Sequence, residues 1–274
     1  MQIVHVISDL PHPANQTVGF VPTMGGFHEG HLSLMRTAKA ECGFVVASLF
    51  VNPTQFGAGE DFERYPRNLE RDAEMAQAAG VDILFAPTTD EMYPRRGTTI
   101  HVPAVTTLWE GASRPGHFEG VATIVCKLFN VVRPNVAYFG LKDLQQCLVI
   151  SRMTADLNLP VTVSLQPTVR ESDGLALSSR NMYLTESERA IAPELQRQLI
   201  SSALALKDNN LSSEEVEVQL RHAKSSLEAV GFRVDYFELI DLSSTHSTHS
   251  AKEGSALIAA AYLGKTRLID NIIL

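Results

Sequence analysis

The sequence has little cysteine and no long apolar run. Its 274 residues include only three cysteines, Cys42, Cys126 and Cys147, and no Cys-x-x-Cys pair. A structural zinc site is therefore not expected, and we predict three reduced thiols buried in apolar segments. The longest apolar runs, 44–51 and 256–263, have the length of strands. They fall well short of the roughly 18 residues that a membrane span requires.

Basic residues are also in short supply. Lys and Arg number 23 against 31 Asp and Glu, which gives a net charge of −8. This balance argues against a nucleic-acid-binding protein, because binding to phosphate backbones needs a surplus of cations. It leaves room for a local basic pocket that holds a small phosphate compound. Residues 1–9 lack a basic leader followed by an apolar core, so we expect a soluble, cytoplasmic protein without a membrane partner.

The first half alternates apolar runs with amphipathic runs. Strands are predicted at 18–22, 44–51, 81–87, 136–139 and 161–165, and helices at 31–42, 68–79, 120–132 and 144–158. Apolar strands that are separated by helices indicate a parallel sheet covered on both faces. The predicted fold class is α/β, with a Rossmann-like doubly wound sheet. Ligands of such sheets bind beyond the carboxyl ends of the strands, which points to the loops 22–30, 52–59, 140–143 and the loop after 165.

The pattern of apolar and polar residues changes after about residue 185. A capping box from Thr185 to Glu188 predicts a helix that runs to 206, and Ser212 and Ser213 predict a second helix that ends at Gly231. Strands are predicted at 234–240, 256–262 and 267–274. The pattern indicates a smaller C-terminal α+β domain. We place the domains at 1–170 and 171–274, with a hinge at about 168–184. The polar segment 243–250 contains His246 and His249 and is interpreted as a solvated turn rather than a metal site.

Residues 21–36 carry the strongest signal for chemistry. A strand leads through a loop with Gly25, Gly26 and Gly30 into a helix, and His28 and His31 lie three residues apart at the helix start. A helix N-terminus attracts phosphate, and two imidazoles on one side of it can donate to phosphate oxygens. The alternatives are two structural histidines or a zinc site. Zinc is disfavoured because the motif supplies only two ligands.

Two further segments offer cations. Lys142 follows a predicted strand, and Arg180 follows Ser178 and Ser179 in a loop with a glycine at 174. Both cations suit phosphate oxygens, and a flexible loop is suited to closing on a ligand. Taken alone, the 174–181 loop is equally well an ordinary polar loop.

Neutral hydrogen-bonding side chains accompany these segments. Asn52 and Gln55 follow a strand, which suits a substrate with hydroxyl and carboxylate groups. Gln145 and Gln146 begin a helix, and we expect at least one of them to face the cleft. Asp143 is predicted to cap that helix.

Together these segments resemble the pantothenate synthetase (pantoate–β-alanine ligase) family, within the nucleotidyltransferase superfamily that has an HxGH signature. His28-Glu-Gly-His31 matches that signature, and Ser178-Ser-Arg-Asn181 stands where the KMSKS-type loop belongs. The matches specific to this family run in order along the chain, at residues 22–25, 50–56, 65–67, 116–122, 142–146, 173–181 and 266–271.

The resemblance implies a set of roles. His31, as proton donor, and His28, Lys142 and Arg180 would be catalytic. The implied ATP-binding residues are Met24, Gly25, Gly26, Phe27, His28, Glu29, Gly30, His31, Gly140, Leu141, Lys142, Asp143, Val169, Leu177, Ser178, Ser179 and Arg180. The implied contacts of pantoate and β-alanine are Gln55, Gln146, Asn52 and Tyr65. The family pattern usually has Glu at position 141, and a small–aliphatic pair at Gly26-Phe27.

The resemblance also implies an activity. ATP and pantoate would form pantoyl adenylate and pyrophosphate, and the β-alanine amine would then displace AMP to give pantothenate. Mg²⁺ would be held mainly by the ATP phosphates, without a dedicated protein metal site. The second domain would act as a lid, and the protein would be a homodimer. The alternatives are a nucleotidyltransferase that joins CMP or AMP to a phosphorylated small molecule, and a non-catalytic nucleotide sensor or RNA-binding relative.

Overall fold

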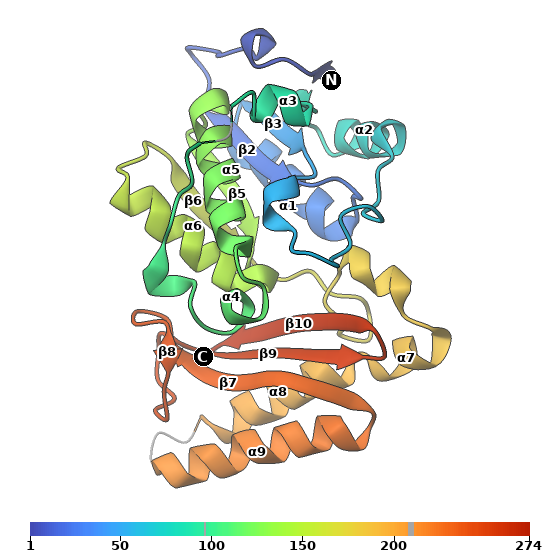
Figure 1. The fold of residues 1–274 in the computed structure, drawn as a ribbon, viewed down its shortest axis with the longest axis vertical. Coiled ribbons are helices and arrows are strands. Elements are labelled where there is room, and N and C mark those ends of the chain that lie inside the picture. Colours follow the sequence, from blue (N-terminus) through green and yellow to red (C-terminus); the bar gives the residue numbers. More distant parts are fainter. Residues whose placement is uncertain (96, 208–210) are drawn as a thin grey trace. The chain divides into compact units, whose positions relative to one another are not determined.

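The chain forms two compact units, residues Met1–Pro167 and Thr168–Leu274. The computed structural model describes residues 1–95, 97–207 and 211–274 (Figure 1). Each unit has its own sheet, with two apolar cores in the first unit and one in the second. No helix in this described part of the chain is long and apolar enough to span a membrane.

The first unit is a six-stranded parallel sheet with the order β1-β4-β3-β2-β5-β6. The strands are β1 (Gln2–Val4), β2 (Val18–Thr23), β3 (Phe44–Leu49), β4 (Ile83–Phe85), β5 (Val136–Gly140) and β6 (Thr162–Gln166). The larger helices are α1 (Glu29–Glu41), α2 (Leu69–Ala78), α5 (His117–Val132) and α6 (Leu144–Asp156). Short helices and turns join them: η1 (Ile7–Asp9), η2 (Pro53–Gln55), α3 (Thr89–Met92), η3 (Pro103–Val105), α4 (Glu110–Ser113) and η4 (Leu141–Asp143).

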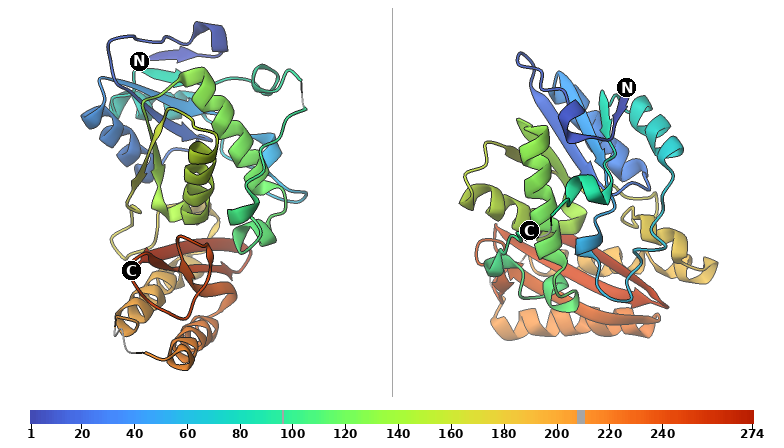
Figure 2. Two further views of the ribbon diagram at one scale, coloured as in Figure 1. Left: turned by 90° about the vertical axis from the view of Figure 1, so that its left-hand side faces the viewer. Right: turned by 45° about the horizontal axis from the view of Figure 1, so that its top comes forward.

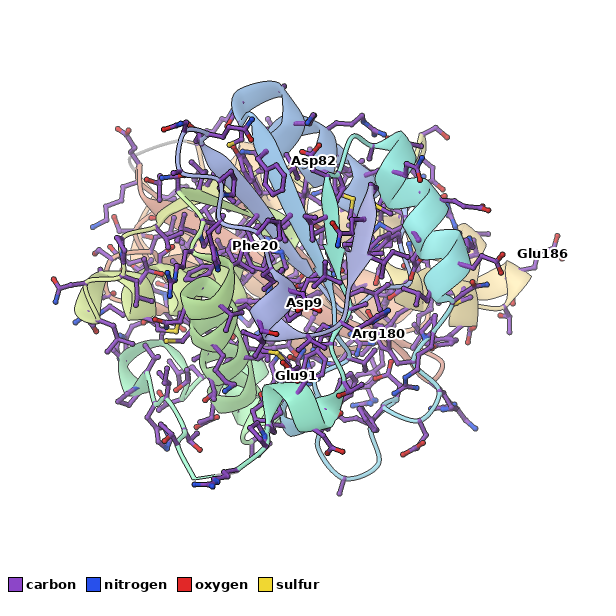
Figure 3. All side chains as sticks on the ribbon, turned by 90° about the horizontal axis from the view of Figure 1, so that it is seen from above. Asp9, Phe20, Asp82, Glu91, Arg180 and Glu186 are labelled. Carbon is purple, nitrogen blue, oxygen red and sulfur yellow. The ribbon has the colours of Figure 1, made fainter. Side chains whose placement is uncertain are left out.

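Helices cover both faces of this sheet, as predicted for a doubly wound fold (Figure 2). Successive residues of a strand point to opposite faces. Phe20 on β2, labelled in Figure 3, therefore packs in one core with residues of α5 and α6. The next residue, Val21, packs in the other core with residues of α1 and α2. Both side chains are fully buried. This two-sided burial explains why the strands read as apolar runs without alternation.

The N-terminal strand was not predicted. Only three residues of β1 pair with β4, with Gln2 opposite Ile83. A segment of this length carries no usable period, and its partner lies about 80 residues away in the chain. The predicted strand 81–87 is shorter in the structure, where β4 covers Ile83–Phe85. The helix predicted at 120–132 begins earlier, at His117.

The second unit is an antiparallel sheet with the order β10-β9-β7-β8. Its strands are β7 (Phe232–Asp241), β8 (His246–Ser247), β9 (Ser255–Leu263) and β10 (Thr266–Ile273). Its helices are α7 (Glu186–Ile191), α8 (Glu194–Ala205) and α9 (Ser213–Ala229), preceded by the turn η5 (Ser179–Tyr183). Leucines of α8 and α9 share one core with β7 and β9. The predicted α+β arrangement is confirmed.

The single helix predicted from Thr185 to 206 is wrong. The structure has two helices, α7 and α8, with Ala192 and Pro193 between them. Proline lacks the N–H that continues a helix, and its ring crowds the preceding turn. The capping box itself is present, because the Thr185 N–H donates to Glu188 Oε2 at 2.8 Å and the Glu188 N–H to Thr185 Oγ1 at 3.3 Å.

Two smaller predictions also need correction. Cys42 and Cys147 are buried free thiols, but Cys126 is only partly buried. It lies on the α5 helix, where partial burial still raises its thiol pKa. The segment 243–250, predicted as a turn, contains the short strand β8, which pairs with the end of β7. His246 belongs to that strand, and its Nδ1 lies 2.6 Å from the Ser244 carbonyl oxygen.

Candidate active site

The loop between β2 and α1 is held by a buried carboxylate. Gly25 and Gly26 have positive φ angles of 85° and 63°, which glycine adopts without steric cost. The N–H groups of Gly26 and Phe27 donate to the two carboxylate oxygens of Asp72 on α2, at 2.8 and 2.9 Å. Asp72 is 1% exposed. This role of Asp72 cannot be predicted from the sequence, because nothing local links position 72 to a loop about 45 residues earlier.

His28 and His31 cap the start of α1. The Gly30 N–H donates to His28 Nδ1 at 3.1 Å, and the His28 N–H points to His31 Nδ1 at 3.4 Å. Their ring centroids are 4.1 Å apart, which confirms that the two rings share one side. The helix begins at Glu29, two residues before the predicted start. Because the N–H groups of Gly30 and His31 donate within the loop, the donors that this loop offers to a phosphate are chiefly imidazole groups.

The charge state of the two imidazoles follows from their surroundings. Burial, together with the Lys142 charge, lowers the pKa of His28 to about 4. Burial, followed by the charges of His28 and Lys142, lowers the pKa of His31 to about 3. Both rings are therefore neutral near pH 7. Since each Nδ1 accepts a backbone N–H, each neutral ring carries its proton on Nε2. The pair thus presents two N–H donors, and Lys142 supplies the positive charge.

Lys142 reaches this site from the end of β5, through the turn η4. Its positive charge contributes to the lowered pKa of both imidazoles. The Asp143 carboxylate lies 3.7 Å from Lys142 Nζ. Asp143 occupies the N-cap position of α6 but makes no side-chain cap hydrogen bond within the described chain. The prediction that its side chain caps the helix is wrong, and its carboxylate instead lies beside the lysine.

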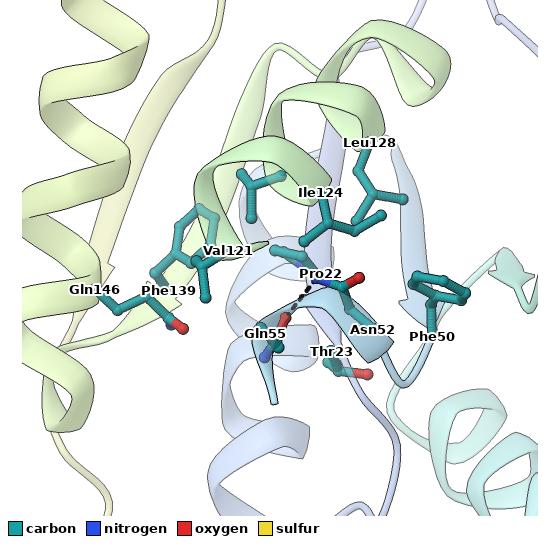
Figure 4. A pocket seen from close by; sticks show the side chains of 11 residues that line it. Pro22, Thr23, Phe50, Asn52, Gln55, Val121, Ile124, Leu128, Phe139 and Gln146 are labelled. Atoms are coloured by element: carbon teal, nitrogen blue, oxygen red, sulfur yellow. Dashed lines mark hydrogen bonds between the residues drawn. The ribbon is translucent and has the colours of Figure 1, made fainter. Parts of the chain in front are cut away.

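A pocket lies next to the β2–α1 loop that carries His28, at the carboxyl ends of β2 and β3 (Figure 4). Its lining residues are all uncharged: Pro22, Thr23, Phe50, Asn52, Gln55, Val121, Ile124, Val125, Leu128, Phe139 and Gln146. Asn52, Gln55 and Gln146 are thus brought together, as the sequence analysis expected of one cleft. The apolar wall from α5 was missed, because its valines, isoleucine and leucine are indistinguishable in sequence from core residues.

Hydrogen bonds fix the amides of this pocket. Asn52 Nδ2 donates to Gln55 Oε1 at 3.0 Å, drawn as a dashed line in Figure 4, and to the Gly120 carbonyl oxygen at 3.1 Å. Asn52 Oδ1 accepts from the Tyr93 hydroxyl at 2.9 Å. Gln55 Nε2 points to Met24 Sδ at 3.0 Å. Asn52 therefore holds the Gln55 amide in place. Gln55 in turn connects the pocket to the histidine loop through its contact with Met24.

Helix α5 lies very close to the η2 turn. A Cβ atom added to Gly120 would lie 2.5 Å from the Thr54 carbonyl oxygen and 2.7 Å from Gln55 Cα. Glycine is therefore required for this approach. Gln145 turns away, since its Nε2 donates to the carbonyl oxygens of Val105 and Leu108, both at 2.9 Å. Tyr65 is buried edge-on against Phe56, and within the described residues it is not among those that line the pocket.

Five of the predicted residues, Val169, Leu177, Ser178, Ser179 and Arg180, belong to the second unit. The Leu177 N–H donates to the Val169 carbonyl oxygen at 3.0 Å, which closes a turn over 169–177. Ser178 caps η5, because its hydroxyl accepts the Arg180 N–H at 3.2 Å. Arg170 holds the turn through a bidentate pair with Asp270, at 2.6 and 2.9 Å, and a 3.1 Å bond to the Gly174 carbonyl oxygen. Ser179 and Arg180 lie directly after this anchored turn.

Three histidines whose pKa is lowered in the folded protein predict a loss of stability in mild acid. Histidines whose pKa is lowered by folding bind protons more readily in the unfolded chain. The free energy of unfolding is therefore highest above about pH 6.5 and falls as the pH drops toward 4. The slope approaches about 1.4 kcal/mol per pH unit for each such histidine, and His28, His31 and His117 all qualify. Urea unfolding at pH 7 and pH 5 measures this loss. The His31→Asn variant should lose less between these pH values, and an identical loss would contradict the assignment.

Comparison with known proteins places the chain in a family. The model of the family described as "Pantoate-beta-alanine ligase" matches residues 2–273. A pantothenate synthetase from Shewanella sp. (strain ANA-3) is 48% identical, over 95% of this chain and 92% of that protein. The crystal structure of pantothenate synthetase from Thermus thermophilus superposes with a TM-score of 0.93 at 48% identity, covering 100% of this chain and 99% of that one. The pantoate-β-alanine ligase of Francisella tularensis, solved in complex with β-γ ATP and β-alanine, gives a TM-score of 0.80 at 33% identity, covering 100% and 97%. The chain therefore belongs to the pantoate–β-alanine ligase family.

Proposed function

We propose that this protein is an ATP-dependent ligase that joins pantoate to β-alanine. The products are pantothenate, AMP and pyrophosphate, and the intermediate is pantoyl adenylate. The observation that carries the proposal is an uncharged pocket beside a loop with two neutral imidazoles, on which the charge of Lys142 from η4 acts. Family membership supports the same reaction.

The pocket suits the chemistry of pantoate. Pantoate has two hydroxyl groups, two methyl groups on one carbon and a carboxylate. The apolar side chains of α5, among them Val121 and Ile124, match the methyl groups, and the amides of Gln55 and Gln146 match the hydroxyl groups. Since the lining residues are uncharged, the carboxylate is best placed toward the histidine loop, where Lys142 provides a cation. Asn52 and Tyr65 then act mainly by supporting the pocket.

The two steps need donors rather than a protein nucleophile. A pantoate carboxylate oxygen attacks the α-phosphorus of ATP, and the bond from that phosphorus to the pyrophosphate oxygen breaks. The β-alanine amine then attacks the acyl carbon, loses a proton, and the bond to AMP breaks. His28 and His31, with protons on Nε2, and Lys142 stabilise the negative charge that builds on the phosphate oxygens. Met24 through Phe27 and Gly140 through Asp143 would border the nucleotide.

Magnesium fits this site as a companion of ATP. Both carboxylate oxygens of Asp72 accept backbone N–H groups, and the described residues contain no group of three or more His, Cys, Asp or Glu that could hold a metal. Mg²⁺ retains several waters and binds readily through substrate phosphates. When bound, it neutralises charge on the leaving pyrophosphate. The side chains assigned to the phosphates are then two N–H donors, His28 and His31, and the cation of Lys142. These groups bind phosphate oxygens and not the magnesium ion.

The proposal extends to the second unit on the strength of the motif match. The resemblance of this motif to the family pattern assigns nucleotide binding to Val169, Leu177, Ser178, Ser179 and Arg180, with Arg180 on the phosphates. The action of this unit as a lid, the homodimer and the cytoplasmic location likewise remain proposals from the resemblance and the sequence.

Isotope tracing tests the reaction. Pantoate labelled with oxygen-18 in its carboxylate should transfer one labelled oxygen to AMP when ATP, Mg²⁺ and β-alanine are present, because the oxygen that attacks phosphorus stays with AMP. Mass spectrometry of AMP and pantothenate measures the transfer, and a reaction without β-alanine is the control for free AMP. A stable nucleotide conjugate without AMP would indicate a nucleotidyltransferase. ATP that binds but is not consumed would indicate a sensor. Either result would refute the ligase.

A further inference from the structure

Helix α5 begins with a histidine that the proposed chemistry leaves without a role. Its first helical residue is His117, which is 8% exposed and lies against the η2 turn that carries Gln55. His117 Nδ1 lies 2.9 Å from the Gln55 carbonyl oxygen. His117 Nε2 lies 3.1 Å from Arg114 Nη1. Both ring nitrogens are therefore engaged by the protein.

These contacts define where the proton of His117 lies. An arginine guanidinium can only donate, so His117 Nε2 must accept from Arg114. The neutral ring then carries its proton on Nδ1 and donates it to the Gln55 carbonyl oxygen. Burial, together with the Arg114 charge, lowers the pKa of His117 to about 4, so the ring is neutral near pH 7. The sequence of donors and acceptors permits only this tautomer.

Arg114 is itself fixed by an acidic residue. Its Nε and Nη2 atoms donate to the two carboxylate oxygens of Glu60 at 2.8 and 2.6 Å. The side chains of Arg114 and Glu60 are only 17% and 24% exposed. A bidentate pair of this kind fixes the orientation of the guanidinium as well as its position. Glu60 therefore orients Arg114, Arg114 sets the tautomer of His117, and His117 holds the backbone of Gln55.

The Gln55 backbone decides where its amide lies in the pocket. The side chain is already held by Asn52, through a 3.0 Å bond to Oε1. Gly120, one turn after His117, lets the helix backbone touch the Thr54 carbonyl group. The hydrogen bond from His117 Nδ1 to the Gln55 carbonyl oxygen adds a third contact that holds this turn. We propose that His117 is a positioning residue for pantoate, which holds Gln55 through its Nδ1–H while Glu60 and Arg114 keep that nitrogen protonated. This inference rests on the ligase function proposed above.

Two substitutions separate the roles of the two ring nitrogens. The amide nitrogen of asparagine sits near the place of Nδ1, so His117→Asn keeps a donor for the Gln55 carbonyl group. Glutamine reaches the place of Nε2 instead. His117→Gln therefore keeps a partner for Arg114 and leaves the Gln55 carbonyl oxygen with only its longer contact to Arg114 Nη2, at 3.5 Å. Loss of one buried hydrogen bond should raise the pantoate KM of His117→Gln by about tenfold. The ATP KM should stay unchanged, and His117→Asn should stay within about threefold of the parent protein.

Thr123→Val is the matched control on the same helix. Thr123 Oγ1 accepts the Ile100 N–H at 2.9 Å, so this variant loses a buried hydrogen bond that does not touch Gln55. It should lower the unfolding midpoint without changing the pantoate KM. If His117→Gln does not fold, Glu60→Gln decides instead, with an expected rise of about threefold in the pantoate KM.

The outcomes are distinct. A pantoate-selective rise in His117→Gln that His117→Asn rescues supports the inference. Equal effects of the two variants, equal rises in the KM of ATP and pantoate, or no change in Glu60→Gln when that variant decides would each overturn it. An unsubstituted protein that forms no pantothenate would refute the ligase function itself, a separate result obtained before any variant is compared.

Discussion

Replacement of His31 by Ala should lower turnover by about 100- to 1,000-fold, the usual effect of losing one preorganised donor to a transition state. His31 is partly buried and its ring lies against that of His28, and its Nε2 proton is free to face a phosphate because Nδ1 accepts the His28 N–H. The loss should appear in turnover more than in KM, because the charge it stabilises develops only in the transition state. Steady-state assays of AMP release measure it.

A matched control for this variant is His101→Ala. His101 is also in the first unit, but its side chain is 71% exposed and pairs with Glu119 at the surface. This control should retain normal turnover and unfold at a normal temperature. Near-normal turnover in purified, folded His31→Ala protein would remove His31 from the mechanism.

Replacement of Asp270 by Asn should destabilise the second unit by about 3 kcal/mol or more, the usual cost of removing one partner from a buried ion pair. The Asp270 side chain is 3% exposed and accepts hydrogen bonds from Nη1 and Nη2 of Arg170. It also accepts the Asn271 N–H at 2.8 Å. Without it, the partly buried Arg170 charge keeps only its bond to the Gly174 carbonyl oxygen among these contacts.

Urea unfolding followed by circular dichroism measures this loss of stability. The control is Arg197→Gln, also in the second unit, which breaks a pair with Glu194 whose arginine is 61% exposed. Exposed pairs contribute about 1 kcal/mol at most. Equal stability losses in the two variants would show that the Arg170–Asp270 pair is no stronger than a surface pair. A limited effect on stability together with a raised ATP KM would instead assign the pair to the position of the following loop.

Local patterns were enough to predict most elements of the fold. Apolar runs predicted five of the six parallel strands, and the capping residues Thr185 and Ser212 marked two helix starts correctly. Proline at 193 was a visible signal for the helix break and was not used. Strand β1 offered no such signal, because its three residues become a strand only through pairing with β4.

Some residues of the candidate site could be identified from local sequence patterns, and others could not. His28, His31 and Lys142 were identifiable because each lies in or beside a glycine-containing segment at a strand end, where parallel sheets bind ligands. Asp72 and His117 were not, since their roles depend on backbone groups that are 45 and 62 residues away in the chain. Such contacts have no sequence period. The tautomers of the histidines likewise cannot be predicted from the sequence, because they depend on the hydrogen-bond geometry.

The contact of Gly120 with the η2 turn has a consequence for altering the substrate range. Because the helix backbone already touches Thr54 and Gln55, the pocket is bounded by two pieces of main chain that have no room to move closer and are held together by Asn52. Bulkier hydroxy acids would have to be accommodated by trimming side chains such as Ile124 or Leu128. Engineering efforts should therefore shorten those side chains and leave the spacing of the two backbones untouched.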